Sequence, residues 1–189
     1  SELRNEGHRW QNDPVYEKAE RQWETYIEGQ GDVHGALKRW VGERQSFLIR
    51  GPPGVGESVA VSACIKMWEA AGVEVHQCAP THSAARELPH GQTLHRPFHS
   101  RTRRGAAPRL KGVLVIDEVY YLSAQLLTLC AQLLVSSPDL CFCLVGDSQQ
   151  LLAPCNTFGG AGPPPFECSA LSFQLAGGRQ VLMTKCRRS

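Results

Sequence analysis

The stretch GPPGVGES at residues 51–58 lies between a short apolar run at 47–50 and a helical pattern at 58–71. It follows the pattern G-x-x-x-x-G-K-[ST] except at the lysine position, which holds Glu57. In this pattern backbone N–H groups surround a chain of phosphates, the lysine contacts the outer phosphates and the hydroxyl ligates Mg²⁺. We therefore expect a phosphate-binding loop formed by Gly51, Pro52, Pro53, Gly54, Val55, Gly56, Glu57 and Ser58.

A glycine-rich turn without a ligand is the alternative interpretation of this stretch. The glycines permit positive φ and the helix that follows favours an anion at its N-terminus, so the phosphate interpretation is preferred. Glu57 opposes it, because a unit charge at about 4 Å from a phosphate contributes about 4 kcal/mol at an effective dielectric constant near 20. We expect binding of ATP and Mg²⁺ to be weakened or lost through Glu57, an inactivating change that either evolved or was introduced.

The composition is that of a globular protein. Of the 189 residues, 42% are hydrophobic and 20% are charged, and the net charge of +2 is too small to indicate nucleic acid by itself. The eight cysteines contain no C-x-x-C pair, which favours reduced thiols in an intracellular, reducing compartment, with nucleus, mitochondrion and cytoplasm left open. No apolar run reaches 18 residues, so we expect no membrane span.

From residue 46 onward, apolar runs alternate with helical patterns. We expect strands at 47–50, 73–78, 112–116, 140–145 and 181–183, and helices at 58–71 and 123–135. This alternation indicates an α/β fold with a parallel sheet covered by helices on both faces. Residues 1–45 are polar and predict an N-terminal helical extension with helices at 15–28 and 33–41. The predicted division is thus 1–45 for the extension and 46–189 for the α/β domain.

A pair of acidic residues follows the strand predicted at 112–116. Asp117 and Glu118 end the run VLVIDE, and ligands of parallel sheets bind at the carboxyl ends of the strands. Asp117 is suited to hold the Mg²⁺ shell, and Glu118 to orient or deprotonate an attacking water. The alternative is that both acids merely cap the following helix.

Six blocks of sequence then occur in a recognisable order. They are GPPGVGES (51–58), APTHSAA (79–85), GQTLH (91–95), VIDE (115–118), GDSQQL (146–151) and LMTKCRR (182–188). Over most of the chain this series resembles the first motor domain of a superfamily 1 DNA helicase of the RecD/Pif branch. The resemblance implies a RecA-like P-loop NTPase fold, with ATP and Mg²⁺ as cofactors and ATP hydrolysis coupled to DNA unwinding.

The resemblance also implies roles for single residues. Ser58 and Asp117 would ligate Mg²⁺, and the catalytic residues would be Glu118, Gln150 and Arg187. Gln150 would sense the γ-phosphate and couple it to DNA. Arg187 would close on the nucleotide, or Arg188 if the register slips by one residue.

Contacts to nucleic acid are implied for two residues and favoured by a basic segment. Thr81 and His95 resemble residues that touch the backbone of single-stranded DNA, although His95 as a core or capping histidine is an alternative. The basic residues that follow favour a phosphate-binding surface and are Arg96, Arg101, Arg103, Arg104, Arg109 and Lys111. A solvated basic loop is the alternative for this segment. Single-stranded DNA is the expected partner, with RNA as the alternative.

The departures from the family pattern lead to two hypotheses of function. Glu57 replaces lysine, the segment 148–154 is altered, and the sequence holds one RecA-like domain where such helicases use two. We therefore expect that this chain alone does not translocate. The first hypothesis is a nucleotide-binding motor domain impaired in hydrolysis. The second is a catalytically inactive, helicase-derived pseudoenzyme that serves as a structural or binding subunit of a larger nucleoprotein assembly.

Overall fold

The structure is a computed structural model, and it describes residues 25–29, 32–52, 56–80, 91–93, 109–147 and 170–184. Within these residues seven strands form one sheet in the order β1-β7-β2-β6-β5-β3-β4, and every neighbouring pair is parallel. The elements, in chain order, are β1 (Thr25–Glu28), α2 (Val33–Gly42), β2 (Phe47–Arg50), α3 (Glu57–Ala70), β3 (Val75–Ala79), β4 (Gln92–Thr93), β5 (Val113–Ile116), the short 3-10 helix η1 (Val119–Tyr121), α6 (Ala124–Ser136), β6 (Cys141–Gly146), α7 (Ala170–Leu175) and β7 (Arg179–Leu182).

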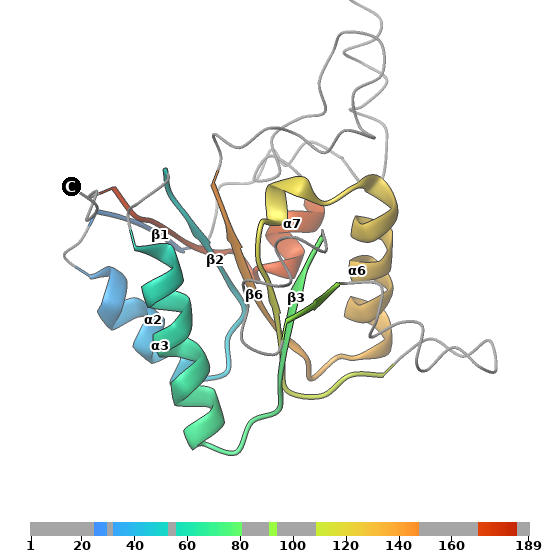
Figure 1. Cartoon of the computed structure of the whole chain (residues 1–189), viewed down its shortest axis with the longest axis horizontal. Coiled ribbons are helices and arrows are strands. Elements are labelled where there is room, and N and C mark those ends of the chain that lie inside the picture. The colour runs from blue at the N-terminus through green and yellow to red at the C-terminus, as the bar shows by residue number, and fades with distance from the viewer. Residues whose placement is uncertain are drawn as a thin grey trace, which may run out of the picture.

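Helices cover both faces of the sheet (Figure 1). α2 and α3 pack on one face, and α6 and α7 pack on the other. Side chains of a strand alternate between the two faces, so β2 sends Phe47 and Ile49 to the α3 side and Leu48 to the α6 side. All three side chains are fully buried. A sheet buried on both faces explains why its strands are continuous apolar runs.

The predicted fold class is confirmed. The expected strands at 47–50, 112–116 and 140–145 and the expected helices at 33–41, 58–71 and 123–135 are present within one or two residues. The last strand begins two residues earlier than expected, and the strand expected at 73–78 begins at Val75. The helix α7, the short η1 and the two-residue β4 were not predicted.

The helix predicted over 15–28 is wrong for residues 25–28, which form the edge strand β1. Residues 15–24 lie outside the described part of the chain. β1 pairs with β7, and the backbone N–H groups of Thr25 and Gly29 bond to the carbonyls of Gly178 and Leu182 at 2.9 and 3.0 Å. These carbonyl acceptors lie on β7 or directly before it, far from β1 in the sequence, so no local pattern predicts this strand. Residues on both sides of position 45 thus share one sheet and one core.

Two further expectations concern cysteines and membranes. Cys64, Cys78, Cys130, Cys141 and Cys143 are free thiols, and all five are buried. These five cysteines thus act as small core residues. No helix among the described residues has the length and apolar character needed to cross a membrane.

Candidate functional site

The phosphate-binding motif lies at the carboxyl edge of the sheet, between β2 and α3. Gly51 follows β2 directly and is buried, while residues 53–55 of the motif lie outside the described residues. In the pairing of β2 with β6, Arg50 stands opposite Gly146. The residues that follow these two strands, Gly51 and Asp147, therefore leave the sheet side by side. The motif opens onto the strand ends, where parallel sheets bind their ligands.

The helix α3 begins as the motif predicts. Gly56 precedes it with φ of 90°, a left-handed conformation that glycine adopts without steric penalty. Glu57 and Ser58 form the first turn, and the side chain of Ser58 is exposed. The N-cap residue Gly56 makes no side-chain hydrogen bond to the N-terminus of α3. The start of this helix therefore turns its first N–H groups and the exposed hydroxyl of Ser58 towards the place where an anion would bind.

Glu57 occupies the lysine position of the motif and is partly buried there. Burial, followed by the nearby carboxylates of Asp147 and Asp117, raises the pKa of Glu57 from its ordinary 4.5 to about 8. Its Oε1 atom is shielded from solvent and has no hydrogen-bond partner among the residues that the structure describes. At neutral pH this side chain is therefore mainly an uncharged carboxylic acid.

The acidic pair after β5 adopts an unusual backbone. The N–H of Asp117 bonds to the carbonyl of Cys78 at 2.9 Å and so extends the pairing of β5 with β3 by one residue. Glu118 has φ of 51°, and its N–H donates to Oδ1 of Asp117 at 2.8 Å. A left-handed glutamate is uncommon, and such residues cluster at functional sites. The left-handed turn lets η1 start directly after the acidic pair.

Gly146 permits this turn to pack against the sheet. A Cβ atom at Gly146 would lie 2.5 Å from Cδ2 of Tyr120 and 2.9 Å from Cγ1 of Val119, both residues of η1. Only glycine leaves room for η1 to cross the end of β6. The first residue of the block GDSQQL is thus needed for packing, beside any role in the site.

Asp147 belongs to the site, although no role was predicted for it from the sequence. It is 4% exposed, lies at the end of β6 and acts on Glu57 together with Asp117. Asp147 could have been predicted from its place directly after β6, the neighbour of the strand β2 that leads into the phosphate-binding motif. This prediction depends on the strand order, which places β6 between β2 and β5.

The residues of the site suit the Mg²⁺ ion of the expected ligand but not its outer phosphates. Ser58 and Asp117 are oxygen donors of the kind that Mg²⁺ prefers. Among the described residues no group of three or more His, Cys, Asp or Glu side chains could hold a metal ion. Glu57 does not fit, because it brings an acid where the outer phosphates require a cation.

Most of the other predicted site residues lie outside the described part of the chain. These are Pro53, Gly54, Val55, Thr81, His95, Arg96, Arg101, Arg103, Arg104, Gln150 and Arg187. Of the basic segment, Arg109 and Lys111 are described and exposed. Both precede β5, so they lie at its amino end, opposite to the edge that carries Asp117. These two basic residues are not brought together with the phosphate-binding motif.

A family model described as "AAA domain" matches residues 29–157, which is more than half of the chain. No curated protein matches the chain at a significant level.

Several solved structures have the same fold. The Pif1 helicase from Candida albicans has a TM-score of 0.60 and 20% identity over 82% of this chain and 39% of its own. A Bacteroides sp Pif1 in complex with ADP-AlF4 has a TM-score of 0.62 and 20% identity, over 85% of this chain and 43% of its own. A Bacteroides Pif1 bound to ssDNA gives a TM-score of 0.54 at 20% identity, over 79% and 41%.

This chain therefore spans less than half the length of these helicases. At such low identity the likeness shows the fold. The family match and the parallel sheet with its strand–loop–helix motif lead to the same conclusion. The chain belongs to the AAA domain family and adopts the α/β RecA-like P-loop fold that it shares with the Pif1 helicases.

Proposed function

We propose that the chain is the nucleotide-binding motor domain of an ATP-dependent DNA helicase, impaired in ATP hydrolysis as it stands. One observation carries the proposal. Gly56, in its left-handed conformation, and the exposed Ser58 open α3 at the strand ends that also carry Asp117 and Asp147. Similar solved helicases, one of them with ADP-AlF4, support the proposal by analogy of fold.

Each proposed role follows from the chemistry of the side chain. Ser58 and Asp117 would hold Mg²⁺ with the phosphates, and Glu118 would orient the attacking water. Gln150 would sense the γ-phosphate and Arg187 would close on it, as the resemblance of the sequence blocks implies. Unwinding would require the whole helicase, of which this chain spans a part.

The impairment follows from the surroundings of Glu57. A lysine would attract a phosphate at about 4 Å by about 4 kcal/mol at an effective dielectric constant near 20. Because the pKa of Glu57 is raised to about 8, the neutral acid gives up this attraction at pH 7 without adding a full repulsion. Above pH 8 the carboxylate would add the repulsion. Nucleotide affinity should therefore be low at neutral pH and lower still at alkaline pH.

A titration with fluorescent ATP and Mg²⁺ tests the proposal. The chain is compared with Glu57→Lys, which restores the missing cation, and with Glu57→Gln, which removes only the ionisable group. We expect weak binding by the chain, micromolar binding by Glu57→Lys and a small gain for Glu57→Gln. Ser58→Ala in the lysine background is the matched control, because it should reduce the Mg²⁺-dependent part of the rescue. Micromolar binding by the unchanged chain would contradict the low nucleotide affinity that we expect from Glu57.

Single-stranded DNA is the proposed polymer ligand. Thr81, His95 and the arginines at 96, 101, 103 and 104 would contact its phosphates. Fluorescence anisotropy with an oligothymidine should show affinity that falls steeply between about 50 and 200 mM salt, because binding releases counterions. Neutralising the arginines at 101, 103 and 104 should reduce both affinity and salt slope, and an RNA oligomer of the same length tests DNA against RNA. Binding that does not depend on salt would refute the assignment.

The second hypothesis, a structural or binding subunit of a larger nucleoprotein assembly, is favoured by the same glutamate. Within the described part of the chain its shielded Oε1 has no hydrogen-bond partner, and two aspartates lie nearby. If Glu57→Lys folds and still binds no nucleotide, the remaining site is not sound and this hypothesis takes precedence. Rescue by lysine would make Glu57 the sole lesion of a helicase motor and would count against it.

A further inference from the structure

The left-handed turn at Glu118 is held by its surroundings. Its φ of 51° is rare for a residue other than glycine. Such a conformation persists only where the neighbouring structure over-determines it. The contacts that fix this turn therefore matter for Glu118, the residue proposed to orient the attacking water.

Three hydrogen bonds hold the turn along its own chain and to β3. The N–H of Asp117 bonds to the carbonyl of Cys78 at 2.9 Å, which ties the start of the turn to the sheet. The N–H of Glu118 donates to Oδ1 of Asp117 at 2.8 Å. The N–H of Tyr121 bonds to the carbonyl of Glu118 at 2.9 Å and closes η1. None of these three bonds joins the turn to β6, the strand that ends beside it.

Packing joins the turn to β6 through Tyr120. A Cβ atom at Gly146 would lie 2.5 Å from Cδ2 and 3.0 Å from Cε2 of the Tyr120 ring. The ring thus occupies the space in which any other residue at 146 would place its side chain. Tyr120 is 7% exposed and belongs to the core cluster on the α6 side of the sheet, and Val119 beside it is fully buried. The residue two positions after Glu118 therefore seats the turn on the end of β6.

Of the two elements in this contact, η1 is the one that can move. β6 is paired with β2 on one side and with β5 on the other. η1 is a three-residue helix between β5 and α6. Two carbon atoms in contact lie about 3.5–4.0 Å apart, so a methyl group at Gly146 would displace the Tyr120 ring by about 1 Å. A misplacement of about 1 Å can reduce the rate of a reaction about 100-fold.

We propose that Tyr120 is a positioning residue for Glu118. Its ring, seated on Gly146, sets the height at which η1 crosses the end of β6 and so holds Glu118 in the left-handed turn. The consequence for hydrolysis rests on the proposed function of the chain. Because Tyr120 acts through Glu118, its loss should affect turnover more than nucleotide affinity.

A purely structural role for Tyr120 predicts a different result. The loss of a buried ring would then lower the free energy of unfolding and leave the turn unchanged in the molecules that stay folded. A positioning role predicts that Glu118 changes its conformation within the folded protein. A local measurement at Glu118 therefore separates the two roles.

NMR of the whole chain without ligand provides this measurement. The three-bond coupling between the N–H and Hα protons of Glu118 reports its φ, and hydrogen exchange of the same amide reports its bond to Asp117. Tyr120→Ala removes the ring, and Gly146→Ala displaces it. We expect each change to speed this exchange about tenfold, the effect of weakening one hydrogen bond, and to alter the coupling. Tyr120→Phe keeps the ring and should keep both values.

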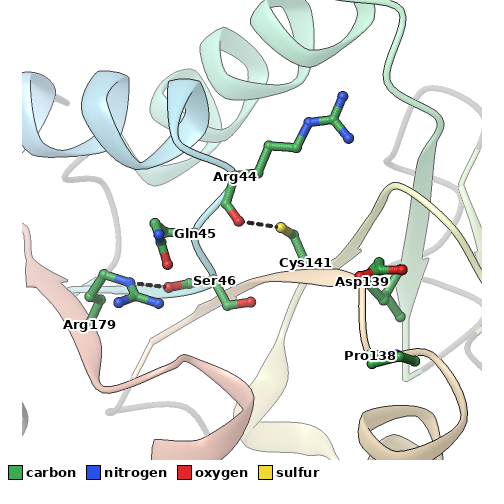
Figure 2. Close-up of a pocket in the computed structure, with 8 residues that line it drawn as sticks. Arg44, Gln45, Ser46, Pro138, Asp139, Cys141 and Arg179 are labelled. Carbon is green, nitrogen blue, oxygen red and sulfur yellow. Dashed lines mark hydrogen bonds between the residues drawn. The ribbon is translucent and has the colours of Figure 1, made fainter.

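A matched control lies at the other end of β6. Cys141 begins this strand beside a pocket of about 520 Å³ that Arg44 and Arg179 also line (Figure 2). The Sγ atom of Cys141 donates to the carbonyl of Arg44 at 2.7 Å. Cys141→Ala removes this bond from a buried position, so urea unfolding should show a loss of stability. The Glu118 amide should not respond, because Cys141 lies at the opposite edge of the sheet.

Turnover is measured in the Glu57→Lys background with ATP and Mg²⁺. Adding Tyr120→Ala should lower kcat about 10- to 100-fold and leave KM within about twofold. Adding Tyr120→Phe should retain most of the activity. This split between kcat and KM is the signature of a residue that positions the catalytic group and does not hold the nucleotide.

Three results would overturn the proposal. The first is a Glu118 amide that is unchanged in both Tyr120→Ala and Gly146→Ala. The second is an equal change in Cys141→Ala, which would indicate general loosening of the fold. The third is a raised KM with unchanged kcat. If Glu57→Lys binds no nucleotide, the proposed function fails, while the ligand-free NMR comparison still decides whether Tyr120 holds the turn.

Discussion

Glu57→Gln is expected to stabilise the folded chain by an amount that grows with pH. The folded protein holds the proton of Glu57 up to about pH 8, whereas the unfolded chain releases it near 4.5. An acid whose pKa is raised in the folded state contributes most to stability at a pH below its pKa in the unfolded chain. This contribution is lost as the pH rises towards its pKa in the folded protein. Glutamine does not titrate, so the difference between the two proteins isolates this loss.

The size of the effect follows from the pKa values. Each tenfold difference in proton affinity corresponds to about 1.4 kcal/mol, which gives an upper limit of about 4–5 kcal/mol for a fully buried group. Glu57 is only partly buried, and solvent screening reduces the effect to about 1–2 kcal/mol. For a chain of this size that difference corresponds to a rise in Tm of roughly 2–8 °C. The gain should be absent at pH 4.5 and complete above pH 8.

Urea unfolding followed by circular dichroism at pH 5, 7 and 8.5 measures this difference. Glu69→Gln serves as the control, because Glu69 is an exposed acid on the same helix and should show no comparable gain. A difference between Glu57→Gln and the unchanged chain that is the same at all three pH values would refute the reasoning. Destabilisation by Glu57→Gln at pH 8.5 would show that the charged carboxylate has a stabilising partner.

Three further predictions concern the scaffold, and each is measured by urea unfolding. Gly146→Ala should destabilise by about 1–3 kcal/mol, because its methyl group would collide with Tyr120, whereas Gly35→Ala, with open space around it in α2, should stabilise by about 0.5–1 kcal/mol. Equal effects of these two changes would disprove the collision. Phe47→Ala should lower the free energy of unfolding by about 3–5 kcal/mol, because a fully buried ring packed against two tryptophan rings is lost. A loss below about 1 kcal/mol would contradict the importance of this packing. Ser123→Ala should cost about 1 kcal/mol, because its hydroxyl caps α6, and no change would show that the cap is dispensable.

Much of the fold could be read from local patterns. The apolar run at 47–50, the glycine pattern and the helix that follows predicted β2 and α3 because each step is encoded by neighbouring residues. Ser123 marked the start of α6, and its side chain caps that helix. Local propensity and turn chemistry act over a few residues, so a single sequence carries these signals in full.

The misses have a common physical cause. β1 was predicted as the end of a helix, because Thr25–Glu28 has no strong pattern and becomes a strand only beside the free edge of β7. β4, a strand of two residues, depends in the same way on β3. Pairing partners far apart in sequence decided these elements, and no window of local sequence contains both partners.

The sequence by itself determined the α/β class, the phosphate-binding motif and the acid at its lysine position. Tertiary structure decided which charged groups surround that acid and therefore its pKa. The strand order places β6 and β5 next to β2, so that Asp147 and Asp117 lie near Glu57 and its pKa rises to about 8. It also decided that Arg44 and Arg179, which are far apart in sequence, line one pocket at the other edge of the sheet. Burial and charge act through space, and the distances that govern them exist only in the folded chain.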